Sequence, residues 1–212
     1  DNTLSEANVH LSRLYRRTGR MAEAATAALA AQSFDDFLLN GLGVAGQLLA
    51  MFRELAVPSQ ARRVCEDGRL LYDSPNFAEC RLVYFGYFGG TRAEADSAWR
   101  ELSAIERPGG GAEPATVGFR RVMVAAVLAR AGLRDSALAV VGRAKRTGAP
   151  GMDLYQTYVL TILGDTDGAI RLLAPLVAQD SSYRTFLRTS YWFLGLREQP
   201  SFRRLAGLEP VP

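Results

Sequence analysis

Residues 11–32 read LSRLYRRTGRMAEAATAALAAQ, where a first apolar stretch gives way at Gly19 to a second stretch rich in alanine. On both sides of the glycine, apolar and small residues recur at the spacing of one face of a helix. Glycine readily accepts the left-handed backbone conformation that ends many helices. This stretch therefore predicts two helices joined by a tight turn.

The same layout recurs along the chain in residues 48–72, 80–105, 121–144 and 155–178. Aligning the five turns brings one alanine of each copy to an equivalent place, and these alanines are Ala24, Ala61, Ala95, Ala137 and Ala169. The successive gaps between them are 37, 34, 42 and 32 residues. A period of about 36 residues is typical of helix pairs that stack side by side.

The residues around each turn predict how the helices end and begin. A glycine lies five positions before four of the alanines, and Ala56 takes this place in the second copy. We expect the left-handed conformation at these glycines, which are Gly19, Gly90, Gly132 and Gly164. Polar side chains near the starts of the second helices are expected to cap free N–H groups, and they are Ser59, Thr91, Asp135 and Asp165. Pro58 suits the first turn of its helix.

This pattern resembles the tetratricopeptide repeat family. In the first copy the matching residues are Leu11, Tyr15, Gly19, Ala24 and Ala31, and in the fourth they are Ala125, Gly132, Ala137 and Ala144. The large Trp and Pro positions of the family are mostly absent. Covering about residues 5–180, the resemblance implies an all-α protein, a right-handed α-solenoid of about five helix pairs.

The expected domains are a repeat array over residues 1–180, with a loop or hinge near residues 106–116, and a C-terminal cap and tail over residues 181–212. In the cap we expect one helix over residues 182–196 and a short helix behind Pro200. A cap of this kind would cover the open face of the last repeat.

Composition and charge exclude several classes of protein. Apolar residues make up 48% and charged residues 22%, which is typical of a folded chain. The net charge is +3 and no block of like charges occurs, which gives little support to nucleic-acid or membrane-surface binding. No apolar run approaches the ~18 residues of a membrane span. Because the chain begins at Asp1, we expect a processed protein or an excerpt of a longer one, and a removed signal sequence is one alternative.

The sequence shows no catalytic constellation. His10 is the only histidine, and no phosphate-binding loop, dinucleotide fingerprint or nucleophile elbow occurs. The paired carboxylates of Asp35 and Asp36 fall at a helix junction and are better read as exposed or capping groups. Cys65 and Cys80 lack metal-site spacing. We expect two buried free thiols, with a disulfide as the alternative in an exported protein. The sequence therefore predicts no enzyme activity, no cofactor and no metal.

Recognition of protein is what the resemblance implies. In the family, the first helix of each pair lines a concave surface, and the residues of this chain at such positions are Arg13, Arg16, Arg17, Arg53, Tyr84, Tyr87, Phe88, Arg130 and Tyr158. Tyrosine and arginine are enriched at interface hot spots, and a groove of this composition suits an acidic or extended peptide. The alternative is that Tyr84 and Phe88 only pack between adjacent helices.

Three functions remain open. The first is a scaffold that binds a partner protein or copies of itself. The second is an exported, self-assembling and filamentous structural protein, to which the apolar residues Leu4, Val9, Phe202 and Leu205 near the two ends would contribute. The third is the regulatory repeat region of a larger bacterial signalling protein. Lys145 is the only lysine, which is typical of a GC-rich bacterial genome. Either the cytoplasm or export is compatible with the sequence.

Overall fold

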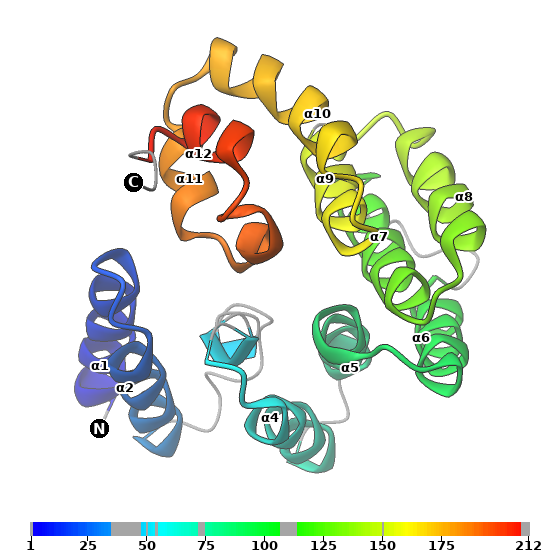
Figure 1. Ribbon diagram of the computed structural model, residues 1–212. Coiled ribbons are helices and arrows are strands. Elements are labelled where there is room, and N and C mark those ends of the chain that lie inside the picture. The colour runs from blue at the N-terminus through cyan, green and yellow to red at the C-terminus, as the bar shows by residue number, and fades with distance from the viewer. Residues whose placement is uncertain are drawn as a thin grey trace. The chain divides into compact units, whose positions relative to one another are not determined.

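The structure is a computed structural model, shown in Figure 1. It describes residues 2–34, 48–49, 51–53, 55–71, 75–106, 114–149 and 151–208. Every secondary-structure element within these ranges is helical, which confirms the expected all-α class. The centre of the expected hinge, residues 107–113, and the pair Asp35 and Asp36 lie outside the described residues.

The chain divides into two compact units. The first consists of Asp1–Phe88 and Ser97–Arg107, and the second of Gly89–Asp96 and Pro108–Pro212. The boundary therefore passes through one helix, α6 (Arg92–Ile105).

In the first unit, the described helices are α1 (Asn2–Arg17), α2 (Met21–Phe34), α4 (Pro58–Leu71) and α5 (Pro75–Phe88), together with helical residues 48–49 and 51–53. Helix α1 packs on α2, and α4 packs on α5. The first of these pairs is close because small residues face each other. Ser5 is buried and donates from Oγ to the carbonyl oxygen of Ala31 at 3.1 Å.

The second unit holds α7 (Pro114–Arg130), α8 (Arg134–Lys145), α9 (Met152–Ile162), α10 (Thr166–Gln179), α11 (Tyr183–Thr189), the 3₁₀ helix η2 (Tyr191–Leu196) and α12 (Pro200–Ala206). Helix α7 contacts both α8 and α9, and α9 contacts α10. Residues 122–129 of α7 are all buried. A helix that is apolar on every side belongs in a core, and α7 is accordingly the central helix of this unit.

The C-terminal segment covers α9 and α10 with aromatic side chains. The ring of Trp192 lies 5.1 Å from that of Tyr158 and 5.5 Å from that of Tyr155. Burial raises the pKa of Tyr155. Behind these rings, Phe193 and Phe202 are fully buried, with ring centroids 5.8 Å apart. These contacts stabilise the end of the unit by removing large apolar surfaces from water.

The single helix expected over residues 182–196 is wrong. The chain breaks at Ser190, whose backbone is extended at φ −79° and ψ 130° and whose side chain accepts a hydrogen bond from the Trp192 N–H. The break lets both Trp192 and Phe193 enter the core. One straight helix would bury only one face of this aromatic-rich stretch. The short helix expected behind Pro200 is confirmed as α12.

Four of the five predicted turns share one pattern of backbone hydrogen bonds. After α7, the N–H of Gly132 donates to Ala129 at 3.2 Å and that of Leu133 donates to Leu128 at 2.9 Å. Equivalent bonds close the turns at Gly19, Ala56 and Gly164. This is the arrangement of a helix end that is closed by a left-handed residue. The repeated turn that the sequence predicted is thus present in four copies.

The left-handed residue of each of these turns has a positive φ. The values are 77° at Gly19, 54° at Ala56, 76° at Gly132 and 73° at Gly164. Ala56 adopts this conformation although its Cβ makes it unfavourable by ~1–2 kcal/mol. The alanine at the expected glycine position therefore makes the second turn less favourable in free energy but leaves its geometry unchanged.

The third turn differs, and the expected left-handed conformation at Gly90 is wrong, because Gly90 is not among the residues of positive φ. Here the Glu94 carboxylate accepts hydrogen bonds from the N–H groups of Gly90 and Thr91 at 3.0 and 2.9 Å. The Thr91 hydroxyl in turn accepts from the Glu94 N–H at 3.2 Å. This reciprocal capping box starts α6.

Two of the other expected caps have different outcomes. Asp165 is a cap, since its Oδ1 accepts from the Gly168 N–H at 2.9 Å. Asp135 lies inside the first turn of α8, whose N-cap is Leu133 without a side-chain hydrogen bond. Its charge still lies near the positive end of the helix dipole, which favours an acidic residue there. Pro58 begins α4, as expected.

The five aligned alanines are all buried. Ala24, Ala61, Ala137 and Ala169 are 0% exposed and Ala95 is 1% exposed. Each donates its N–H to the carbonyl oxygen four residues earlier, at the start of the helix after the turn. Because alanine projects only a methyl group, helix backbones can approach closely at these places. A larger side chain would have to displace a neighbouring helix.

The turns predict opposite effects for two substitutions. Gly132→Ala should lower the free energy of unfolding by about 1 kcal/mol through backbone strain alone, because a Cβ at Gly132 would have no neighbour within 4 Å. Ala56→Gly should raise it by up to about 1 kcal/mol, since relief of strain exceeds the added entropy of the unfolded chain. Urea unfolding followed by circular dichroism measures both.

Gly90→Ala is the matched control for these substitutions, because Gly90 does not need a positive φ and its Cβ would meet the Arg130 Cβ at an ordinary 3.4 Å. We expect a smaller loss there than at Gly132. Equal losses at the two glycines would contradict the assignment of the left-handed turn.

Candidate functional site

The candidate site lies in the first unit and is built on α5. Tyr84, Phe85 and Phe88 occupy neighbouring positions of this helix and are each partly exposed. The ring of Tyr84 lies 5.3 Å from that of Phe88 and 5.7 Å from that of Phe85. Phe88 is four residues after Tyr84 and three after Phe85, and residues at these spacings are neighbours on a helix surface. Tyr87, by contrast, is only 7% exposed and belongs to the core. We call Tyr84, Phe85 and Phe88 the aromatic face.

Arg53 borders the aromatic face. Its guanidinium carbon lies 5.8 Å from the centroid of the Phe88 ring, within the range of a cation–π interaction. The Arg53 Nε is buried and has no hydrogen-bond partner among the described residues. The guanidinium thus lies over the Phe88 ring, and the Arg53 side chain as a whole is partly exposed.

A small hollow of about 40 Å³ opens beside the aromatic face, between α4 and α5. Its lining comprises Arg62, Cys65, Glu66, Arg81, Tyr84 and Phe85. Arg62 Nε pairs with Glu66 at 3.1 Å, and Arg81 Nη2 pairs with Glu101 at 3.0 Å. The hollow therefore combines an aromatic wall with charged groups of both signs. Such a lining suits a peptide side chain better than a purely apolar ligand.

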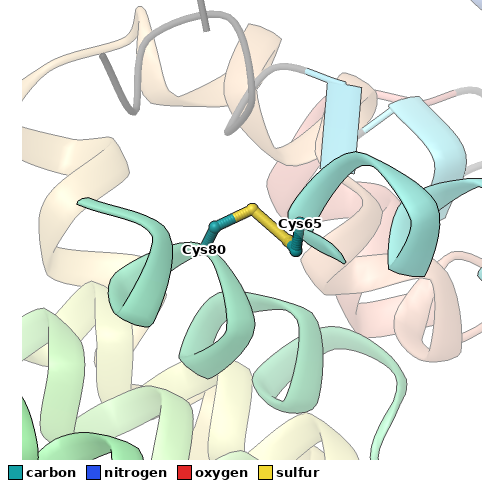
Figure 2. The surroundings of a disulfide bond; sticks show 2 residues. All are labelled: Cys65 and Cys80. Carbon is teal, nitrogen blue, oxygen red and sulfur yellow. A yellow bond between two sulfur atoms is a disulfide. The ribbon is translucent and has the colours of Figure 1, made fainter. Parts of the chain in front are cut away.

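A disulfide joins α4 to α5 at the bottom of this region (Figure 2). It links Cys65 to Cys80, whose Cα atoms are 5.5 Å apart, and both residues are 1% exposed. The expectation of two free thiols is therefore wrong, and the alternative of a bridge holds. The packing of α4 on α5 brings the two cysteines within bonding distance, which the 15-residue separation along the chain could not show.

Two other predicted site residues lie in the second unit and contact each other. Arg130 Nη2 donates to the Tyr158 hydroxyl at 2.5 Å, and Nη1 donates to the Gly89 carbonyl oxygen at 3.2 Å. Tyr158 is 3% exposed and stacks on Trp192. The structure places this pair in an internal network that ties α7 to α9 and to the aromatic cap.

The three arginines predicted on α1 remain at the surface. Arg13, Arg16 and Arg17 are all exposed. Nearby, Arg20 lies over the ring of Tyr15 at 4.5 Å and pairs with Glu23 at 2.9 Å. A backbone hydrogen bond and the Arg20 side chain lower the pKa of Glu23. These arginines form a basic end of the α1–α2 pair that is separate from the aromatic face.

Sequence reasoning did not identify Arg62, Glu66, Arg81 and Phe85, which also line the hollow. Arg62 and Glu66 are spaced i, i+4 on α4, and Arg81 and Phe85 are spaced i, i+4 on α5. This spacing could have placed each pair on one helix face. The mutual approach of the two faces has no signal in the sequence, because it follows from the packing of α4 on α5.

Over the part of the chain that the structure describes, no group of three or more His, Cys, Asp or Glu side chains could hold a metal ion. His10 is exposed on α1. None of the described helices is long and apolar enough to cross a membrane. No protein-family model, curated protein or solved structure matches this chain.

The disulfide predicts a measurable loss of stability on reduction. A bridge that closes a 15-residue loop stabilises the fold by about 3 kcal/mol, chiefly by restricting the unfolded chain. The double substitution Cys65→Ala and Cys80→Ala should lower the free energy of unfolding by about this amount, and a phosphine reductant should do the same to the unmodified chain. Urea unfolding of all samples measures the effect.

The doubly substituted chain treated with reductant is the control, and its unfolding midpoint should not change. If reduction left the midpoint of the unmodified chain where it was, the bridge between α4 and α5 would make no contribution to stability.

Proposed function

We propose that the chain is a non-enzymatic interaction scaffold of the tetratricopeptide type, a right-handed α-solenoid that binds a partner protein or copies of itself. Two features support the proposal. One turn geometry recurs at Gly19, Ala56, Gly132 and Gly164, and this is what repeated helix pairs require. In addition, the chain offers a partly exposed aromatic surface.

The aromatic face is the observation that carries this proposal. Tyr84, Phe85 and Phe88 leave large rings partly open to solvent beside a hollow that contains charged groups. Aromatic rings with nearby arginines are the usual anchors of protein interfaces. The Arg53 guanidinium already lies over the Phe88 ring, so less side-chain entropy would be lost when a carboxylate binds it. The ligand that fits is an acidic or extended peptide.

A second candidate, the exported self-assembling protein, is favoured by the disulfide. Disulfides persist in oxidising compartments, which include the bacterial periplasm and the cell surface. Leu4, at one of the two ends, is 49% exposed and could contact another copy. Phe202, which was expected to contribute at the other end, is 0% exposed because it is buried within the cap. An end-to-end contact would therefore need other residues there.

The proposal predicts a peptide-binding surface on α5. Selection of displayed peptides on the immobilised, disulfide-intact chain should converge on sequences that contain acidic residues. Arg53→Ala or Tyr84→Ala should weaken their binding by about tenfold or more, as expected for interface anchors. Fluorescence anisotropy of the selected peptides measures the dissociation constants.

Arg63→Ala is the matched control, because Arg63 is exposed on α4 and does not line the hollow. Light scattering over a wide range of concentration separates the two kinds of partner, since a self-binding chain would exceed its 23.1 kDa mass. A monomer at every concentration that also selects no convergent peptide would refute the scaffold function.

A further inference from the structure

The net charge of the chain is concentrated at its C-terminal end. Residues 181–212 hold five of the 25 basic residues and two of the 22 acidic residues. Residues 1–180 therefore carry 20 of each kind and are neutral overall, and the whole net charge of +3 resides in the last 32 residues. The five basic residues are all arginines, namely Arg184, Arg188, Arg197, Arg203 and Arg204.

The fold brings these arginines together on packed elements of the second unit. Arg184 and Arg188 are spaced i, i+4 on α11, which packs against α12. Arg203 and Arg204 lie in the last turn of α12. The end of α12 lies close to α11, since a Cβ at Gly207 would be 3.8 Å from the Arg184 Cδ. We call the exposed residues Arg184, Arg188 and Arg204 the arginine face.

The positive charge of the arginine face is not neutralised within the described structure. Arg188 Nε donates to the carbonyl oxygen of Arg184 at 3.3 Å, which is a neutral group. Among the described residues, Arg184, Arg188 and Arg204 have no ion pair with an acidic side chain. Glu198 is exposed in the same segment, and the Asp180 carboxylate is hydrogen-bonded to Ser182.

Helix stabilisation does not explain the arrangement. Arginines in the last turn of a helix, such as Arg188 and Arg204, can stabilise the negative end of the helix dipole. Arg184, however, is the second residue of α11, next to the positive end, where a cation is unfavourable. An exposed arginine at that position is therefore not accounted for by the local fold.

We propose that the arginine face is a docking surface for an acidic segment of a partner protein. Guanidinium groups bind carboxylates through paired N–H donors, and three neighbouring forks match a segment with several Asp or Glu side chains. Nucleic acid is less well matched, because it requires a longer basic track and residues 1–180 are neutral.

This inference rests on the proposed scaffold function and assigns it a second surface, distinct from the aromatic face. The test compares two variants of the full chain with the same change of charge. Arg184→Gln, Arg188→Gln and Arg204→Gln are combined in one variant. The control variant combines Arg63→Gln, Arg92→Gln and Arg146→Gln, which are also exposed but lie on α4, on α6 and directly after α8. Circular dichroism verifies that both variants are folded.

The probe is a fluorescein-labelled oligoglutamate peptide, and an oligothymidylate of equal charge serves as the comparison. We expect the unmodified chain to bind oligoglutamate more tightly than oligothymidylate, with an affinity that falls as salt is added. The arginine-face variant should bind oligoglutamate about tenfold more weakly, and the control variant should bind as the unmodified chain does.

Three results would overturn the inference. These are no binding of oligoglutamate by the unmodified chain, an equal affinity of the two variants for oligoglutamate, and preferential binding of oligothymidylate that is lost in the arginine-face variant. The last would assign the surface to nucleic acid. The scaffold function is tested separately, by the peptides selected on α5 and the Arg53 and Tyr84 variants, so a failure of one test is distinguishable from a failure of the other.

Discussion

Four of the five turns within the predicted helix pairs depend on one residue that holds the left-handed conformation. At Gly132 and its equivalents, this residue lets the following N–H bond back across the helix end, so the chain reverses within a few residues. Five residues later an alanine enters the core with 0% exposure, and a larger side chain there would push the two helices apart. The turn sets the direction of the second helix, and the alanine sets its distance.

Large aromatic side chains gather at two places in this structure. In the second unit they fill the C-terminal cap, where Trp192 packs on Tyr155 and Tyr158 and Phe193 packs on Phe202. On α5, Tyr84, Phe85 and Phe88 are only partly buried. The disulfide between Cys65 and Cys80 ties that helix to α4 beside the hollow. A bridge there holds the aromatic face in place, so that a ligand need not order it on binding.

Local features of the structure were predictable from sequence, and features that depend on packing were not. The turns at Gly19, Gly132 and Gly164 and the buried alanines follow from residue type and spacing. The capping box of Thr91 and Glu94 was also readable in principle, yet the glycine before it suggested the commoner turn. The disulfide, the hollow and the internal pairing of Arg130 with Tyr158 arise where separate helices meet, and no local pattern specifies such a meeting.

Amide hydrogen exchange followed by NMR tests the shared turn most directly. The amides to observe are those of Arg20, Val57, Leu133 and Asp165, each of which donates to the carbonyl oxygen five residues earlier at 2.9–3.0 Å. If the turn is shared, all four amides should exchange slowly, at rates comparable to those of the adjoining helices, and Val57 beside the strained Ala56 is no exception. Exchange of any of the four at the rate of an unstructured peptide would contradict a common turn.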